Sequence, residues 1–241
     1  MTSDPRAVRI AATFAVPPAL VAGVVAGVLG GAITAVVVFA ALLVALMTWA
    51  RYAGERAVER GLAALGATRA DPVGDARLAN LVDGLSMSAG LAPPRLEVVE
   101  ADGLNALAAA GKAGKGVIAV TTGLLRELEL IELEAVLAEL LVQIRRGDAV
   151  PATMTVGTFG LGRRLAAPAE RDALADQAGV ALTRYPPALA AALEKIETKG
   201  AEVPGSPPAM AHLWVADPGG ADQRDPARLP LSERIEALRE L

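Results

Sequence analysis

The sequence contains no cysteine and a single histidine, His212. The absence of cysteine excludes disulfide bonds and every zinc site that uses thiolate ligands. With one histidine, no motif that needs two of them, such as the His-Glu-x-x-His of many zinc proteases, can occur in the chain. We expect His212 itself to be a packed or hydrogen-bonded structural residue.

Aromatic residues make up 3% of the chain, and no basic run studded with aromatics occurs. Nucleic-acid-binding surfaces need clustered cations, so nucleic acid is not expected as a partner. The Gly-x-Ser-x-Gly elbow of serine hydrolases is absent as well. The stretch GKAGKG at residues 111–116 lacks the spacing of a Walker phosphate loop, so it predicts a hairpin loop and no bound nucleotide.

No charged residue lies between Arg9 and Arg51. A helix needs about 20 residues to cross the hydrocarbon core, so this gap has room for two spans. We expect them at residues 10–29 and 32–49, joined by a turn at Gly30-Gly31, with a single long tilted helix as the alternative. Glycine recurs every four residues, at positions 23, 27 and 31, which favours close approach of two helices.

Positive charge flanks both ends of this apolar region, with Arg6 and Arg9 before it and Arg51, Arg56 and Arg60 after it. By the positive-inside rule, both ends face the cytoplasm. The sequence therefore predicts a multi-pass protein of the cell membrane, with the lipid bilayer as one partner and the main domain in the cytoplasm. Residues 1–50 form the hairpin, residues 51–74 a juxtamembrane helix and linker, and residues 75–241 the domain.

Within the domain, the pattern predicts a small sheet and several helices, which makes the fold class α+β. A helix begins near Asp75 and ends at Gly90. Strands are expected at Leu96–Glu100, Asn105–Ala110 and Val117–Thr121, the last two as a hairpin. A longer helix is expected over residues 130–146.

That longer helix carries the stretch LEAVLAELLVQIRRGD, residues 133–148. Leucine, valine and isoleucine recur at helical spacing and form a broad apolar face. The remaining polar side chains form a narrow stripe of Glu132, Glu139, Gln143 and Arg146. We expect this stripe to be solvated, and its middle to line an open cleft.

Several segments, taken in order, resemble the HtpX-type membrane zinc metallopeptidases, the family that also contains the CAAX prenyl proteases. They are AGLAPPRLEVVEADGLNALAAAG, GVIAVTTGLL, LEAVLAELLVQIRRGD, ERDALADQAGVALT, HLWVADP and SERIEALREL. The resemblance covers roughly residues 75–241. It implies a mainly helical metallopeptidase-like domain in which Asn105 and Ala106 begin an edge strand beside the cleft.

The family's zinc chemistry is altered at every central position of this resemblance. The first zinc-binding histidine falls on Glu139, the catalytic glutamate on Leu140 and the second histidine on Gln143. The third ligand, a glutamate in the family, falls on Asp172, and Asp176 matches a family aspartate. An amide oxygen is a weak ligand for zinc, and leucine can neither accept nor donate a proton.

These substitutions predict no catalytic residue, no bound metal and no cofactor. The resemblance leaves Asn105, Ala106, Glu139, Gln143 and Asp176 as residues expected to line a cleft. The oxygen atoms of Glu139, Gln143, Asp172 and Asp176 are an alternative donor set for calcium or magnesium. The pair Asp172 and Asp176, one helical turn apart, is more typical of salt bridges than of acid–base chemistry.

The interval between the zinc helix and the third-ligand helix also departs from the family, which places a second pair of membrane spans there. Here the longest apolar stretch, residues 149–162, is too short to cross and is expected at the bilayer surface or packed on the domain. The sequence thus predicts a catalytically inactive, membrane-anchored HtpX-like pseudopeptidase that binds, regulates or scaffolds a membrane protein or peptide. The alternatives are an active membrane metalloendopeptidase with a non-standard metal site, for which zinc would be the cofactor, and a purely structural anchor.

Overall fold

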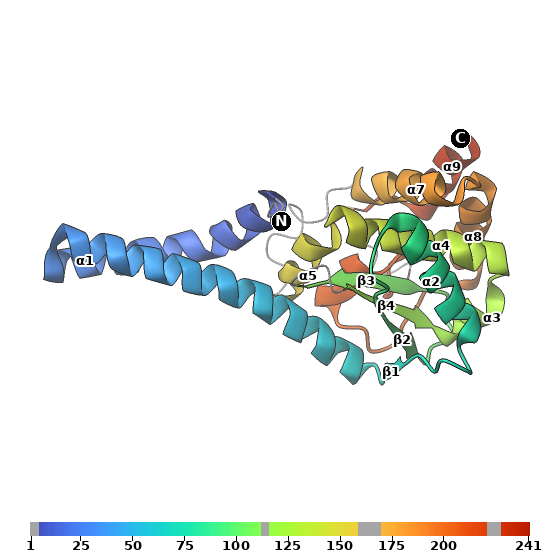
Figure 1. The fold of residues 1–241 in the computed structure, drawn as a ribbon, viewed down its shortest axis with the longest axis horizontal. Coiled ribbons are helices and arrows are strands. Elements are labelled where there is room, and N and C mark those ends of the chain that lie inside the picture. The colour runs from blue at the N-terminus through green and yellow to red at the C-terminus, as the bar shows by residue number, and fades with distance from the viewer. Residues whose placement is uncertain (1–4, 112–115, 159–169, 221–227) are drawn as a thin grey trace.

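The computed structural model describes residues 5–111, 116–158, 170–220 and 228–241. A long helical projection extends from a body in which helices surround a small sheet (Figure 1). The fold is therefore α+β and mostly helical, as the sequence predicts.

The projection is α1, Pro5–Ala64, whose backbone leaves the helical conformation at Gly31, with φ 82° and ψ 176°. The chain reverses there, so that two helical arms lie side by side (Figure 1). A Cβ on Gly27 would lie 3.0 Å from the Cβ of Ala35, which shows how closely the arms approach. The backbone stays helical through Pro17 and Pro18, so these prolines do not break the first arm.

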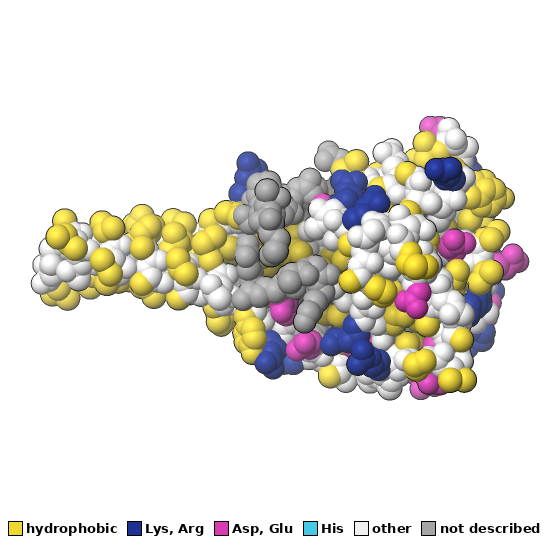
Figure 2. Space-filling model, viewed as in Figure 1, with side chains coloured by type: hydrophobic (Ala, Val, Ile, Leu, Met, Phe, Trp, Pro, Cys, Tyr) yellow, Lys and Arg dark blue, Asp and Glu magenta, His cyan; other side chains and the backbone are white. Residues whose placement is uncertain are grey.

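The outer surface of these arms is apolar. Figure 2 shows hydrophobic side chains along the projection and charged side chains on the body. Val28, Leu29 and Ile33 near the reversal are each more than 80% exposed. Within the described residues, α1 is the one helix long and apolar enough to cross a membrane.

The second arm continues without interruption into the body and ends at Ala64. It packs on α5, Ala149–Gly157, where a Cβ on Gly54 would lie 2.6 Å from the Thr153 carbonyl oxygen. Small side chains of both arms and Met154 of α5 form one apolar cluster, made up of Ala7, Ala11, Ala50 and Met154. The segment expected at residues 149–162 thus packs on the protein up to Gly157, and residues 159–162 lie outside the described part.

The sheet has four strands in the order β1-β2-β4-β3. Its strands are β1, Thr68–Arg69; β2, Arg95–Val99; β3, Ala106–Ala110; and β4, Gly116–Thr121. Antiparallel pairing of β3 with β4 confirms the predicted hairpin, whose loop at 112–115 lies outside the described residues. The short β1 was not predicted, because its two residues lie in a Pro- and Gly-rich linker and become a strand only by pairing with β2.

Helices cover the sheet and extend beyond it. They are α2, Ala76–Ala89; α3, Thr122–Glu127; α4, Leu130–Arg146; α7, Glu170–Thr183; α8, Pro186–Lys199; the 3₁₀ helix η2, Pro208–Leu213; and α9, Leu231–Arg239. The predicted end of α2 at Gly90 is confirmed by its left-handed backbone. A reciprocal capping box between Glu129 and Glu132 begins α4.

The prediction that the polar stripe of α4 is solvated is wrong for most of its length. Glu132 is 5%, Glu139 1% and Gln143 5% exposed. At Glu139 the reason is α7, because a Cβ on Gly179 would lie 2.8 Å from the Glu139 Cα, whereas Glu132 pairs with Lys195 of α8. A neighbouring helix therefore covers the side that periodicity alone assigns to solvent.

Candidate functional site

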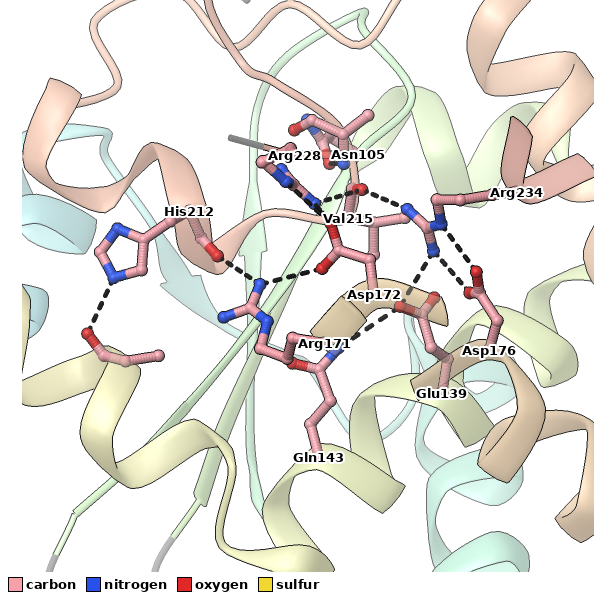
Figure 3. Close-up of polar contacts among 12 residues, drawn as sticks. Asn105, Glu139, Gln143, Arg171, Asp172, Asp176, His212, Val215, Arg228 and Arg234 are labelled. Atoms are coloured by element: carbon pink, nitrogen blue, oxygen red, sulfur yellow. Dashed lines mark hydrogen bonds and ion pairs between the residues drawn. The ribbon is translucent and has the colours of Figure 1, made fainter. Parts of the chain in front are cut away.

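Three helices and the chain before α9 bring charged side chains together inside the body. Glu139 and Gln143 come from α4, Arg171, Asp172 and Asp176 from α7, and Arg234 from α9, while Arg228 precedes α9 (Figure 3). We call the three arginines and three carboxylates of this set the arginine–carboxylate cluster. Its members are buried or nearly so, which makes every charge in it costly without a partner.

Arg234 lies at the centre of the cluster and is 2% exposed. Its Nε donates to Asp176 Oδ2 at 2.8 Å and its Nη2 donates to Asp176 Oδ1 at 2.6 Å, which is a bidentate pair. The same Nη2 donates to Glu139 Oε1 at 3.1 Å. Its Nη1 donates to the Val215 carbonyl oxygen at 2.9 Å. One guanidinium therefore joins α4, α7 and the chain at Val215.

The other two arginines hold Asp172. Arg228 Nε donates to Asp172 Oδ2 at 3.0 Å, and Arg171 Nη2 donates to Asp172 Oδ1 at 3.2 Å. Arg228 Nη2 also donates to the Val215 carbonyl oxygen at 2.9 Å, and Arg171 Nη2 to the His212 carbonyl oxygen at 2.7 Å. The cluster thus holds two backbone carbonyls as well as its own carboxylates.

The surroundings fix the charges of these groups. Burial by itself raises the pKa of Asp172, but Arg228, Arg171 and Arg234 outweigh burial and hold that pKa well below its usual range. Burial lowers the pKa of Arg171. Burial has the same tendency at Arg234, yet Asp176 and Glu139 keep the pKa of its guanidinium above the ordinary value. Asp172 and Arg234 are therefore charged at neutral pH.

Glu139 differs from the other two carboxylates. Burial raises the pKa of its carboxyl to about 8, Asp176 and Asp172 act in the same direction, and Arg234 opposes them. Gln143 Nε2 and Arg234 Nη2 both donate to Oε1, whereas the buried Oε2 has no hydrogen-bond partner. The negative charge of an ionised Glu139 therefore gains no hydrogen bond at Oε2, which acts in the same direction as burial.

Asn105 and Ala106 lie beside the cluster and are fully buried. The Asn105 side chain donates to the carbonyl oxygens of Ala201 and Ala216 at 2.8 and 2.9 Å, and its Oδ1 accepts from the Ala216 amide at 3.2 Å. Neither residue faces solvent, and that they line a cleft stays a prediction. Asn105 is linked to the cluster through the chain at Ala216, because the neighbouring Val215 carbonyl oxygen accepts from Arg228 and Arg234 (Figure 3).

His212 lies in η2, outside the arginine–carboxylate cluster, and is 1% exposed. Its Nε2 lies 2.9 Å from Thr155 Oγ1 and 2.8 Å from the Ala152 carbonyl oxygen. These contacts join η2 to α5. They agree with the structural role expected of this histidine.

The oxygen donors of the cluster do not fit a zinc ion. Arg234 donates to Glu139, while Arg228 and Arg171 donate to Asp172, so a positive charge already lies beside each carboxylate that could coordinate a metal. Leu140, on which the resemblance puts the family's catalytic glutamate, is buried in the main apolar core. Over the described ranges, no group of three His, Cys, Asp or Glu residues is arranged to hold a metal.

Comparison with known proteins shows which family this chain belongs to. No protein-family model matches it. The Protease HtpX homolog of Acidiphilium cryptum is 32% identical over 238 residues, which cover 80% of this chain and 82% of that protein. The chain belongs to the HtpX-type family. The HtpX homologs of Tropheryma whipplei (30% identical, 68% of this chain and 72% of that protein) and Thermoanaerobacter pseudethanolicus (26%, 82% of each) agree.

Family membership confirms the resemblance seen in the sequence, and the structure adds two residues that sequence reasoning missed. In this HtpX-type chain, Arg228 donates to Asp172, and Arg234 donates to Glu139 and Asp176. A signal for Arg234 was present, because it falls on the same face of α9 as the buried Ile235 and Leu238. An arginine on an apolar helix face needs a buried partner. No comparable signal marks Arg228.

Proposed function

We propose that this HtpX-type chain is a membrane-anchored pseudopeptidase that binds, regulates or scaffolds a membrane protein or peptide without cleaving it. The two arms of α1 cross the bilayer with both ends in the cytoplasm, and the body lies on the cytoplasmic side. The single observation that carries the proposal is the arginine–carboxylate cluster. In it, guanidinium groups donate hydrogen bonds to the carboxyl groups that would otherwise be available to coordinate a metal cation.

The lack of a proton acceptor at residue 140, where the resemblance puts the family's catalytic glutamate, supports the same proposal. A zinc peptidase needs a base that takes a proton from the attacking water, and such help is worth about 10²–10⁴-fold in rate. Leu140 is a fully buried hydrocarbon side chain and offers no proton acceptor. Glu139, the nearest carboxyl on α4, is buried and hydrogen-bonded to Gln143 and Arg234.

The catalytic part is tested on the purified full-length chain in lipid nanodiscs. After incubation with zinc and dialysis, we expect far less than one zinc per chain and no cleavage of an unfolded substrate such as casein. Stoichiometric zinc together with chelator-sensitive proteolysis would establish the alternative, an active metalloendopeptidase with a non-standard site. That alternative is favoured by the names of the relatives, which are proteases.

A gain-of-binding variant makes this test sharper. Four substitutions return the family ligands and base: Glu139→His, Leu140→Glu, Gln143→His and Asp172→Glu. A fifth, Arg228→Ala, removes the guanidinium that contacts residue 172. We expect tight zinc binding by the five-fold variant and none by Arg228→Ala alone, because the ligands on α4 and α7 then converge with one competing guanidinium fewer, while Arg171 and Arg234 remain.

Topology is tested separately with reporter fusions at residue 5 and after residue 60. Both reporters should read cytoplasmic, because Gly31 reverses the chain between two apolar arms. Opposite locations of the two reporters would establish a single span and contradict the hairpin part of the proposal, whatever the outcome of the zinc assay.

A further inference from the structure

Strand β3 is the end strand of the sheet, and Val215, which contacts its outer edge at Ala106, also accepts hydrogen bonds from Arg228 and Arg234 of the arginine–carboxylate cluster. An extended peptide usually binds a sheet as an additional strand at its edge, because the N–H and C=O groups of an edge strand are free to form hydrogen bonds. Here the five residues of β3 are all at most 3% exposed. Other parts of the same chain therefore cover this edge.

The covering part is residues 212–216, which we call the inner segment. Its Val215 amide donates to the Ala106 carbonyl oxygen at 2.8 Å, and Trp214 forms an antiparallel bridge with Leu107. Asn105 extends this pairing by one residue, since its side-chain amide both donates to and accepts from the Ala216 backbone. The inner segment thus contacts the edge of β3 through an isolated β-bridge and one backbone hydrogen bond, and Asn105 adds the next contact.

The far end of the edge is closed by a side chain from another element. The Ala110 amide donates to Thr153 Oγ1 of α5 at 3.0 Å. On its opposite side, the inner segment is held by the arginine–carboxylate cluster, because Arg228 and Arg234 both donate to the Val215 carbonyl oxygen. Arg171 holds the carbonyl oxygen of His212 at the start of the segment.

We infer that the inner segment is a built-in peptide occupant of this edge, locked there by Asn105 and the arginines. An external peptide can pair with β3 only when the inner segment leaves. This inference rests on the proposed function in treating the region as a binding site and not a catalytic one. It also gives the cluster a role, because arginines that occupy the carboxylates at the family's metal positions also hold the segment that closes the edge.

Amide hydrogen exchange on the unaltered full-length chain in nanodiscs tests the lock. The Val215 and Ala216 amides should exchange as slowly as those of β4, on the order of 10⁴-fold slower than in a free peptide. Gly219 and Gly220 follow the segment and serve as the comparison. The inference is overturned if the Val215 and Ala216 amides exchange as fast as theirs. This measurement needs no variant, so it does not depend on a substitution being tolerated.

Peptide binding tests the occupancy. The probe is a fluorescent peptide of residues 209–218, AMAHLWVADP, added to the unaltered chain, to Val215→Pro and to Ala216→Pro. Each substitution removes one amide by which the inner segment donates to the edge, to the Ala106 carbonyl oxygen or to Asn105 Oδ1, while the edge and the probe peptide stay unaltered. The open form therefore gains population, and the apparent affinity for the probe should rise roughly tenfold. Arg239→Ala is the matched control, because Arg239 pairs with Glu194 on the exposed surface and should leave binding unchanged.

Equal binding by the unaltered chain and both variants would refute the inference. So would a folded Val215→Pro variant in which the Ala216 amide exchanges quickly while no peptide binds. Should Val215→Pro fail to fold, Ala216→Pro carries the peptide test alone. Zinc content and casein cleavage report on the proposed function, whereas exchange and peptide binding report on the inner segment, so failure of one is distinct from failure of the other.

Discussion

Replacing Glu139 by glutamine should make the protein more stable at neutral and alkaline pH. Glutamine has nearly the shape of a protonated glutamate, and its carbonyl oxygen can accept from Arg234 and Gln143 as Oε1 does now. It cannot ionise. The wild-type side chain can, and in its buried place the pKa is raised from 4.5 to about 8.

The sign and the size follow from this difference. A group whose folded-state pKa is raised favours the folded state fully below pH 4.5, and this contribution is lost as the pH rises toward 8. Each pH unit in that window changes the free energy of unfolding by about 1.4 kcal/mol, so wild type loses about 3 kcal/mol by pH 7 relative to Glu139→Gln. For a domain of this size, that corresponds to roughly 6–12 °C in Tm.

Thermal unfolding of both proteins in nanodiscs, followed from pH 4.5 to pH 9, measures the effect. The two melting temperatures should nearly coincide at pH 4.5 and separate as the pH rises. Asp172→Asn is the matched control with the opposite slope, because the arginines lower the pKa of Asp172 and its contribution is lost at acid pH. Parallel curves for wild type and Glu139→Gln would show that Glu139 is ionised in the fold and refute the reasoning.

Three further predictions concern packing and the membrane boundary. Leu140→Asp should cost several kcal/mol of unfolding free energy, while Leu130→Asp on the exposed start of α4 should cost little; equal melting temperatures would contradict the burial of that helix face. Gly54→Ala should lower stability by about 1–3 kcal/mol in chemical denaturation, because the added methyl meets the α5 backbone, and an unchanged midpoint would contradict that contact. Replacing Trp214 by phenylalanine leaves the exposed Trp49 as the one tryptophan. Its fluorescence should be quenched most by lipids brominated near the headgroup. Strongest quenching by lipids brominated at the acyl-chain ends would contradict the predicted end of the second membrane span at residue 49.

Much of the fold could be predicted because its signals are local. Helical periodicity and a left-handed glycine marked α2, and a long apolar face marked α4 to within a residue. Alternating turns and apolar runs gave the β3–β4 hairpin. The strand β1 escaped prediction, since two residues carry no periodicity and its pairing with β2 is a tertiary contact.

The candidate site could be predicted only in part, because its chemistry depends on contacts between distant residues. Sequence position indicated Glu139, Gln143, Asp172 and Asp176, and the structure brings them near one another. Their burial could not be predicted, since it results from the close approach of α7 at Gly179. Nor could the partners, because a sequence shows that a carboxylate is present but not which arginine, some 60 residues away, neutralises it.

The continuous helix from Gly31 to Ala64 has a mechanical consequence. At 1.5 Å per residue it is about 50 Å long, and its last turns pack against the body, where a Cβ on Gly61 would collide with the Met210 side chain. No flexible tether separates the anchor from the body. In the proposed topology the body therefore stands at one height above the bilayer with one face toward it, and it moves only with the anchor. A partner must be met by diffusion in the plane of the membrane, at that height and in that orientation, and any tilt of the anchor turns the body by the same angle.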